Sequence, residues 1–448
     1  KQAGDNIEII VPYYKMTRDR FENEITFVKK CSCQLGERTI EYGLCRGELS
    51  GVTVWFIEHE HFFHRPRLYG YGDDSLRFAF FSRAVVDLIG QYDHMPEILH
   101  CNDWETALSV IYLKNDAVVR DELKPIKSVY TIHNIAYQGQ FGERDLTEVF
   151  ALPQGWYDGG LGYEFEGRQD INLMKGAMLV SDAVTTVSPT YAMQLHDSAY
   201  AHGLESIVSA VSYKLHGVLN GIDMTAYDPA VDNAIPAVYT PEEMEGKAKC
   251  KADLQVSLGL REDPEVPVMA IVSRLVGHKG VDLVCGGFDK MMETGAQLVV
   301  LGKGDEYYED FFRSQAYRYG GRVAAQITYS DALSRRIYAG ADLFLMPSKS
   351  EPCGLSQMIA MRYGTVPIVR KTGGLADSVK SCQVGQEDGT GLLFNDYKVE
   401  DMLGVIHQAV QLYHGDRAGF GMVQKRGMTY DFSWKRSAED YHNIYQNL

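Results

Sequence analysis

The sequence lacks the features of membrane and exported proteins. Its 448 residues contain no run of 18 apolar residues and no signal-peptide pattern. A membrane-spanning helix needs about 20 predominantly apolar residues, and an export signal needs a basic segment followed by an apolar one. We therefore expect neither membrane insertion nor a membrane partner.

Positive charge is also scarce. Lys and Arg number 44 against 60 Asp and Glu, which gives a formal net charge of −16, and no block of basic residues occurs. Repulsion of this sign disfavours nucleic acid and anionic lipid as partners. An anionic small molecule would need a local positive pocket, because the overall field repels it.

Paired cysteines and acidic metal motifs are missing as well. None of the eight cysteines shows the spacing of a zinc site, and we interpret the close pair Cys31 and Cys33 as structural. Free thiols in a reducing compartment, the cytoplasm, are therefore expected. No Asp-x-Asp occurs, which argues against a metal-bridged diphosphate, and no G-x-S-x-G, which argues against acyl hydrolysis at a nucleophile elbow.

Two successive halves alternate short apolar runs with helix-spaced segments, a pattern that predicts parallel βαβ units. A polar stretch with several prolines, residues 228–265, separates them and contains a predicted helix near 242–258. The expected fold is α/β, with two doubly wound Rossmann-like domains facing across a cleft that binds ligands. The predicted strands are 6–12, 52–57, 98–101, 128–133, 183–187 and 214–219 in the first half, and 267–272, 297–301, 323–329, 343–346 and one from Val366 in the second.

Four other segments have individual predictions. Residues 22–51 alternate polar and apolar side chains and predict a small β excursion. Residues 156–167 are rich in glycine and aromatics and predict a long functional loop. Residues 171–180 and the tail 431–448 are expected to be helical.

The main candidate site begins in the turn after strand 343–346. Glu351 lies there, where the carboxyl ends of strands in an open α/β sheet meet their ligands. Gly354-Leu355-Ser356 opens a helix whose free amides can bind an anion, and Thr372-Gly373-Gly374 forms a second opening that admits close backbone approach. A carboxylate beside two sets of amides fits a sugar joined to phosphates. The alternative is that Glu351 caps the helix and the glycines serve ordinary turns.

Further candidates follow other strands. Arg274 and Lys279 come after strand 267–272, and a planar fork beside a point charge suits a diphosphate. Tyr329 could stack on a base, although core packing is the usual role of such a tyrosine. Asp103 and His133 end adjacent strands of the first half and are expected to face the cleft, while the alternative for a lone histidine is a core position.

Taken together, the motifs resemble those of bacterial glycogen synthases and plant starch synthases, over essentially the whole chain and in the same order. Each motif is shared by wider glycosyltransferase families, but the set is specific. The motifs are Asn102-Asp-Trp104, Thr131-Ile-His-Asn134, Ser188-Pro-Thr-Tyr191, Leu219-Asn-Gly-Ile-Asp223, Ser273-Arg-Leu275 with Lys279-Gly280, Pro347-Ser-Lys-Ser-Glu-Pro-Cys-Gly-Leu-Ser-Gln357, Arg362-Tyr-Gly-Thr365, Thr372-Gly-Gly-Leu-Ala-Asp377 and Asp431-Phe-Ser-Trp434.

The resemblance implies a GT-B fold with an acceptor-side domain over residues 1–225, a nucleotide-sugar domain over 226–430 and a helix over 431–448 that crosses back to the first domain. It also implies transfer of glucose, with retention, from a nucleotide diphosphate to the 4-OH at the non-reducing end of an α-1,4-glucan. The residues do not distinguish ADP-glucose from UDP-glucose, but similarity to bacterial and plastid enzymes favours ADP. No metal or cofactor is expected, and the bacterial cytoplasm is the expected location, with a plastid as the alternative.

Site roles follow from the same resemblance. Arg274 and Lys279 would hold the diphosphate with the amides of Leu355 and Ser356, and Tyr329 would stack on the base. The residues implied around the donor glucose are Glu351, His133, Asn220 and Asp103, with Cys353 beside it. A double displacement needs a carboxylate nucleophile beneath the sugar. Because the resemblance places the one candidate, Glu351, on the sugar hydroxyls, we expect front-face displacement.

The sequence departs from the family at its start. Family members open with a strand and a Lys-Thr-Gly-Gly-Leu loop, whereas this sequence begins with Lys1 after that point. We expect the sequence to be part of a longer chain, with an inactive glucan-binding homologue as the alternative. A further alternative is a GT-B enzyme with a small sugar-phosphate acceptor, and a phosphorylase is disfavoured because no pyridoxal-phosphate lysine context occurs.

Overall fold

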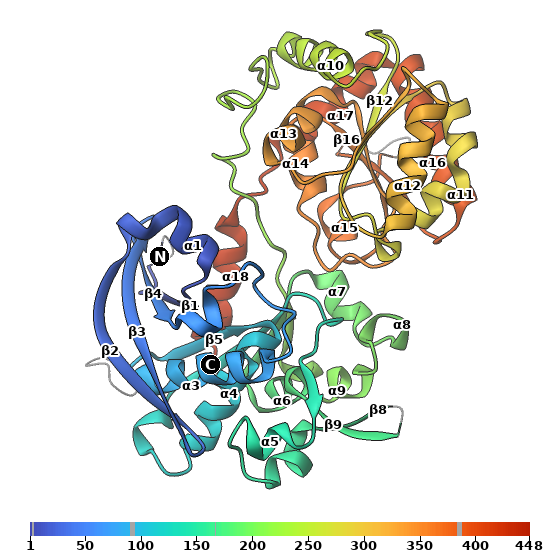
Figure 1. Cartoon of the computed structure of the whole chain (residues 1–448). Coiled ribbons are helices and arrows are strands. Elements are labelled where there is room, and N and C mark those ends of the chain that lie inside the picture. Colours follow the sequence, from blue (N-terminus) through green and yellow to red (C-terminus); the bar gives the residue numbers. More distant parts are fainter. Residues whose placement is uncertain (2–3, 90–94, 166, 383–387) are drawn as a thin grey trace. The chain divides into compact units, whose positions relative to one another are not determined.

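The computed structural model describes residues 1, 4–89, 95–165, 167–382 and 388–448 (Figure 1). The chain forms two compact units whose segments alternate along the sequence. Unit 1 comprises Lys1–Thr186, Leu195–His216 and Ala438–Leu448, and unit 2 comprises Val187–Gln194 and Gly217–Ser437. Parallel sheets in both units confirm the predicted α/β class, while the domain boundaries near residues 225 and 430 stay a prediction.

Unit 2 is built on a six-stranded parallel sheet in the order β14-β13-β12-β15-β16-β17. This is the doubly wound order 3-2-1-4-5-6, whose direction reverses where β12 pairs with β15. All residues of β13 and β15 are buried, which explains why these strands appear in the sequence as uninterrupted apolar runs. The strands are β12 Val268–Val272, β13 Gln297–Leu301, β14 Val323–Gln326, β15 Leu343–Met346, β16 Val366–Arg370 and β17 Leu392–Phe394.

Helices cover both faces of this sheet. Figure 1 shows α11 and α16 on one face and α13 and α14 on the other. In α11, buried apolar residues recur at helical spacing (Val284, Phe288, Met291) and join a cluster with the sheet residues. The helices of unit 2 are α7 Pro189–Gln194, α10 Glu245–Ser257, α11 Val281–Glu293, α12 Glu306–Arg318, α13 Asp331–Gly340, α14 Ser356–Arg362, α15 Gly373–Ser378, α16 Val399–Gly415 and α17 Arg417–Thr429, with the 3-10 turn Gly277–Lys279 before α11.

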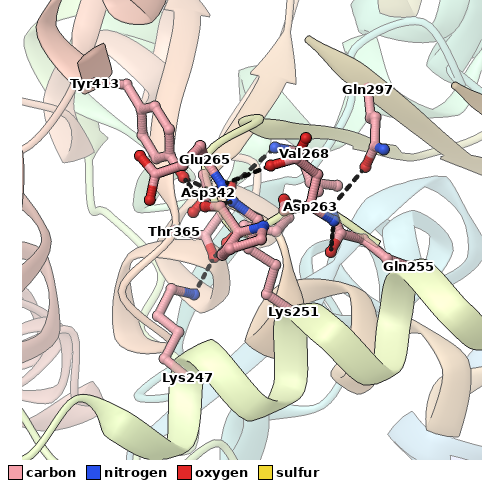
Figure 2. Close-up of polar contacts among 12 residues, drawn as sticks. Lys247, Lys251, Gln255, Asp263, Glu265, Val268, Gln297, Asp342, Thr365 and Tyr413 are labelled. Atoms are coloured by element: carbon pink, nitrogen blue, oxygen red, sulfur yellow. Dashed lines mark hydrogen bonds and ion pairs between the residues drawn. The ribbon is translucent and has the colours of Figure 1, made fainter. Parts of the chain in front are cut away.

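Helix α10 is attached to the amino ends of the strands by polar side chains. Lys251 and Gln255 lie four residues apart and point from the same side of the helix (Figure 2). Lys251 Nζ lies 2.8 Å from Asp342 Oδ2 and donates to the Tyr413 hydroxyl at 2.6 Å. Gln255 Nε2 donates to Gln297 Oε1 at 2.8 Å. A helix that is polar on this side is therefore held by buried hydrogen bonds rather than by an apolar stripe.

Lys247, one turn earlier on α10, caps the C-terminal ends of two helices. Its Nζ donates to the carbonyls of Ala339 at 3.0 Å and Tyr363 at 2.9 Å, and to Thr365 Oγ1 at 2.9 Å. These carbonyls belong to the C-terminal ends of α13 and α14, where helix dipoles leave negative charge. Burial lowers the pKa of Lys247 to about 7.

Unit 1 contains two four-stranded sheets and a small antiparallel one, in the orders β1-β4-β3-β2, β11-β10-β6-β5 and β7-β9-β8. The β excursion predicted for residues 22–51 is confirmed as the antiparallel pair β2 and β3. The strands are β1 Glu8–Pro12, β2 Thr26–Leu35, β3 Arg38–Leu49, β4 Val52–Glu58, β5 Ile98–Asn102, β6 Lys127–Ile132, β7 Gln140–Gly142, β8 Gly162–Phe165, β9 Arg168–Asn172, β10 Ala183–Thr186 and β11 Leu215–Gly217.

Helices alternate with the strands of unit 1 along the chain. They are α1 Lys15–Phe21, α2 Glu60–Phe63, α3 Asp74–Ile89, α4 Asp103–Asp116, α5 Asp145–Glu148, α6 Leu173–Val180, α8 Ser198–Ala201 and α9 Glu205–Ala210, with 3-10 turns at Glu22–Glu24, Asp121–Leu123 and Ser212–Lys214. Within the described ranges, no helix combines the length and apolar character needed to cross a membrane.

The predicted crossing helix is confirmed as α18, Trp434–Gln446, which begins among the residues of unit 2 and ends among those of unit 1. At its start, the Ser437 hydroxyl donates to the Leu219 carbonyl. Near its end, the Tyr445 hydroxyl lies 2.7 Å from His100 Nδ1, and His442 Nδ1 lies 2.9 Å from Asp5 Oδ1.

Two predicted segments differ from the structure in the kind of element that they form. Residues 156–167 are not one loop, because they contain a π-helical turn, Tyr157–Leu161, followed by β8. Residues 171–180 begin in β9, and α6 starts only at Leu173. Apolar residues lie on both sides of the boundary between β9 and α6, so they do not mark it. Asn172 does mark it, because its side chain caps α6 by accepting from the Lys175 amide at 2.9 Å.

Candidate active site

The loops after β12 and β15 meet at the carboxyl edge of the unit 2 sheet, where the strand order reverses. Gly280 adopts φ of 76°, and a Cβ there would overlap the Pro347 carbonyl. The Lys349 amide donates to the His278 carbonyl at 2.9 Å. This glycine therefore lets the turn carrying Lys279 pack directly on the loop that leads to Glu351.

Lys279 and Glu351 form the central ion pair of this edge. Lys279 Nζ lies 2.8 Å from Oε1 and 2.7 Å from Oε2 of Glu351. The Ser348 hydroxyl donates to Glu351 Oε2 at 3.0 Å. Glu351 is 5% exposed, so the lysine compensates a buried negative charge. The alternative that Glu351 caps α14 is wrong, because among the described residues its carboxylate accepts from Lys279 and Ser348 and from no amide of that helix.

Arg274 supplies a second positive charge. Its side chain is exposed, and it forms no ion pair with any residue that the structure describes. A Cβ on Gly302 would overlap the Ser273 carbonyl, so the loop after β13 supports the arginine turn closely. Burial and the charges of Lys279 and Arg274 lower the pKa of His278. The edge is thus a local cationic site in an acidic chain.

The two glycine turns lie directly against each other. A Cβ on Gly373 would overlap the Glu351 carbonyl, and one on Gly374 would overlap that of Cys353. The amides of this second turn are occupied, since Gly373 N donates to Gln194 Oε1 at 3.0 Å and Gly374 N to the Glu351 carbonyl at 3.1 Å. The glycines therefore serve close backbone packing rather than an open set of amides.

The first turn keeps its amides available. Gly354 adopts φ of 74°, and α14 begins immediately after it. In the part of the chain that the structure describes, the amides of Leu355 and Ser356 donate to no protein acceptor. Free amides at the start of a helix favour an anion.

Cys353 and Asn220 lie together beside this turn. The Cys353 side chain is buried and hydrogen-bonded to the backbone of Asn220. Burial raises the pKa of Cys353 to about 12, so the thiol stays protonated at neutral pH. It can contact a ligand but is not a ready nucleophile.

The sequence predicts a strand over residues 323–329 with Tyr329 at its end. In the structure β14 ends at Gln326, and Tyr329 lies beyond it. Its side chain is 88% exposed, so core packing is excluded. Ser330 caps the following helix α13 by accepting from the Leu333 amide at 3.2 Å. The exposed ring is available to stack on a planar ligand.

Asp103 and His133 form a separate arrangement in unit 1. They follow the paired strands β5 and β6, and Asp103 Oδ1 accepts from the His133 amide at 2.8 Å. The His133 ring nitrogen Nε2 lies 2.9 Å from Asn102 Oδ1. Burial raises the pKa of Asp103, although the His133 charge opposes this. Asp103 also has φ of 56°, unusual for a non-glycine residue. The prediction that these two residues end adjacent strands is confirmed.

Four residues that the sequence did not single out support the turns of unit 2 through hydrogen bonds to Gly373, Glu351, Gly354 and Gly374: Gln194, Ser348, Gln357 and Ser378, respectively. Ser348 and Gln357 lie inside the motif around Glu351, and their position there is the one available signal. Gln194 and Ser378 carry no signal, because their contacts depend on how distant segments pack. No group of three or more His, Cys, Asp or Glu side chains suited to a metal ion occurs among the described residues.

Two family models match the chain. One, described as starch synthase catalytic domain, matches residues 1–210, and another, glycosyl transferases group 1, matches residues 257–418. A glycogen synthase of Alkaliphilus metalliredigens is 38% identical over 448 residues, which cover 100% of this chain and 94% of that protein. A glycogen synthase of Ligilactobacillus salivarius is 39% identical, covering 100% and 93%.

Solved structures show the same relationship. The catalytic domain of starch synthase IV from Arabidopsis thaliana, bound to ADP and acarbose, is similar with a TM-score of 0.90 and 32% identity, covering 100% of this chain and 92% of that one. Sucrose-phosphate synthase from Thermosynechococcus elongatus has a TM-score of 0.56 and 17% identity, covering 90% and 85%. The second likeness shows the GT-B fold alone.

Proposed function

Because this chain belongs to the family of bacterial glycogen synthases and starch synthases, we propose that the residues at the carboxyl edge of β12 and β15 bind its sugar donor. The protein is a glycosyltransferase that moves glucose from ADP-glucose to the non-reducing end of an α-1,4-glucan. The two amino-acid identities near 38% over the full length of the chain support this activity.

The diphosphate of the donor binds to Arg274, Lys279 and the amides of Leu355 and Ser356. The observation that carries this assignment is the cationic edge at the reversal of strand order, in a chain with a net charge of −16. Arg274 is free to form a bidentate contact with phosphate. Tyr329, an exposed residue just before α13, stacks on the adenine.

Within unit 2, the donor glucose contacts Glu351, Asn220 and Cys353. His133 and Asp103 of unit 1 are assigned to sugar binding by the family resemblance alone. Glu351 accepts from sugar hydroxyls, and the neutral Cys353 thiol lines the pocket. Thr372-Gly373-Gly374 packs against the backbone of Glu351 and holds its loop in place.

Transfer proceeds by front-face displacement. Glu351 is bound to Lys279 and Ser348, which does not favour it as the free nucleophile that double displacement requires. As the bond to glucose breaks, negative charge grows on the ADP phosphate. Arg274, Lys279 and the two amides stabilise that charge, and the phosphate takes the proton of the acceptor 4-OH.

The proposal includes no metal and no cofactor, and neither nucleic acid nor a membrane as a partner. All eight cysteines are free thiols, which supports a cytoplasmic location. A small sugar-phosphate acceptor is not favoured, because the likeness to sucrose-phosphate synthase is restricted to the fold.

The test is incorporation of labelled glucose from ADP-glucose into glycogen, with UDP-glucose as a parallel donor and fructose 6-phosphate as a parallel acceptor. We expect rapid labelling of glycogen from ADP-glucose and little from the other combinations. Preferential transfer to fructose 6-phosphate, or no transfer at all, would overturn the proposed function.

A further inference from the structure

We propose that Gln357 and Ser378 are positioning residues that join the two glycine turns of the donor site and aim the amide of Leu355. The inference rests on the proposed function, because it concerns how the ADP-glucose site is held in shape. Neither residue is proposed to contact the donor. Both act through the backbone of the turns around Gly354 and Gly374.

Gln357 lies in the first turn of α14 and reaches back to the turn that precedes this helix. Its Nε2 donates to the Gly354 carbonyl at 2.8 Å and lies 3.3 Å from the Cys353 carbonyl. The same nitrogen donates to the Ser378 hydroxyl at 2.9 Å. The side chain is 0% exposed, so these hydrogen bonds lie in the protein interior.

Ser378 completes the connection from the other side. It ends α15 and is 3% exposed, and its hydroxyl donates to the Gly374 carbonyl at 2.6 Å. An unbroken series of hydrogen bonds therefore runs from the Gly354 carbonyl through Gln357 and Ser378 to the Gly374 carbonyl. Two turns that are distant in sequence are fixed to each other by two side chains.

The bond to Gly354 determines where a proposed ligand-binding amide points. The carbonyl of Gly354 and the N–H of Leu355 belong to the same peptide unit, which is planar and trans. Holding the carbonyl inward on Gln357 therefore directs the N–H of Leu355 the opposite way, out of the protein interior. That amide is one of the two proposed to bind the diphosphate.

Stability alone does not explain a glutamine at position 357. Among the described residues, Gln357 Oε1 is buried and accepts no hydrogen bond. An unpaired buried oxygen is costly, and a methionine of similar length would fill the space without it. A Cβ on Gly354 would lie 2.6 Å from this oxygen, which together with the positive φ reserves the position for glycine.

The experiment compares Gln357→Met, Ser378→Ala and the double variant with the natural protein. Isothermal titration with ADP gives the affinity, and urea denaturation gives the unfolding midpoint. Thr294→Ala is the matched control, because its hydroxyl donates to the Met291 carbonyl at 2.7 Å at the far end of α11 from Lys279.

We expect Gln357→Met to weaken ADP binding about tenfold and Ser378→Ala about threefold to fivefold. The double variant should bind no more weakly than Gln357→Met, since side chains in one network are not additive. Ser378→Thr, which keeps the hydroxyl, should bind ADP nearly as the natural protein does. Thr294→Ala should lower the urea midpoint and leave ADP affinity unchanged.

The outcomes separate this inference from the proposed function. If the natural protein binds no ADP, the proposed function fails. If it binds ADP and both single variants bind equally well while unfolding at lower urea, the two side chains are only structural and the inference is overturned. Should Gln357→Met not fold, the comparison of Ser378→Ala with Ser378→Thr decides the question alone.

Discussion

Lys279 Nζ lies 2.8 and 2.7 Å from the two carboxylate oxygens of Glu351, so the residue proposed to hold phosphate neutralises the residue proposed to hold sugar. An incoming donor brings its own negative charge and its own hydroxyl donors. Lys279 can then bind the donor phosphate in place of Glu351, and Glu351 can accept from the sugar hydroxyls in place of Lys279. The pair thus keeps a buried carboxylate compensated until the ligand arrives.

Replacing Lys279 by alanine should lower kcat by about 10²-fold or more, on the scale of losing one group that stabilises a developing negative charge. It also leaves Glu351 without its cation, so the free energy of unfolding should fall. Steady-state kinetics with ADP-glucose and glycogen, and urea denaturation, measure both effects. Lys290→Ala, an exposed lysine on α11, is the control. Near-normal turnover would refute the role of Lys279.

Arg274→Ala should separate activity from stability. The arginine is exposed and takes part in no ion pair that the structure describes, so its loss should change the free energy of unfolding by less than about 0.5 kcal/mol. Its contact with the leaving phosphate should nevertheless cost about 10²-fold in kcat. The same kinetic and denaturation measurements apply. A variant that is unstable but fully active would contradict the assignment.

Tyr329→Ala should weaken ADP binding by about tenfold, because stacking on a base contributes about 1–3 kcal/mol. Tyr329→Phe keeps the ring and should bind ADP almost normally. Tyr317→Ala is the matched control, since that tyrosine is 92% exposed in the same unit but lies on α12. Titration calorimetry with ADP measures all three. Equal affinity in Tyr329→Ala and the natural protein would remove the stacking role.

Lys247→Met should reveal a pH-dependent contribution to stability. Burial lowers the pKa of Lys247 from 10.5 to about 7, so between these values the unfolded chain binds a proton that the folded chain does not. Stability from this group therefore rises as pH rises, by up to about 1.4 kcal/mol per pH unit. The unfolding free energy of the natural protein minus that of Lys247→Met should increase from pH 7 to pH 9.

Urea denaturation at pH 7, 8 and 9 tests this expectation, and subtracting the variant cancels the titration of other groups. A difference that stays constant over this range would mean that Lys247 remains an ammonium when folded. Its oxygen acceptors, the carbonyls of Ala339 and Tyr363 and the Thr365 hydroxyl, would then outweigh the effect of burial.

The strands and the edge that they form could be predicted from the sequence. Parallel strands buried on both faces appear as short apolar runs, which identified β12, β13 and β15. Because all of these strands run the same way, the residues after each one had to lie at one edge. This places Arg274 and Glu351 near each other without knowledge of the tertiary packing.

Specific contacts within that edge could not be predicted. Nothing in the sequence pairs Lys279 with Glu351, since the distance between two loops depends on the close packing that Gly280 permits. Helix α10 shows that a charged residue type does not establish exposure. Lysines are usually solvated, yet Lys247 and Lys251 are buried and bind groups at helix ends and at the amino end of β15. The Gln357–Ser378 bond could not be predicted because it joins α14 to α15, and their packing depends on tertiary structure.

The alternation of segments between the two units has a practical consequence for protein engineering. Neither unit is encoded by one continuous stretch of gene, because the chain changes unit after Thr186, Gln194, His216 and Ser437. Exchanging the nucleotide-binding half with that of a relative by a single splice would therefore mix parts of both. A chimaera that respects the folded units needs a junction at each of those positions, including one inside the last helix.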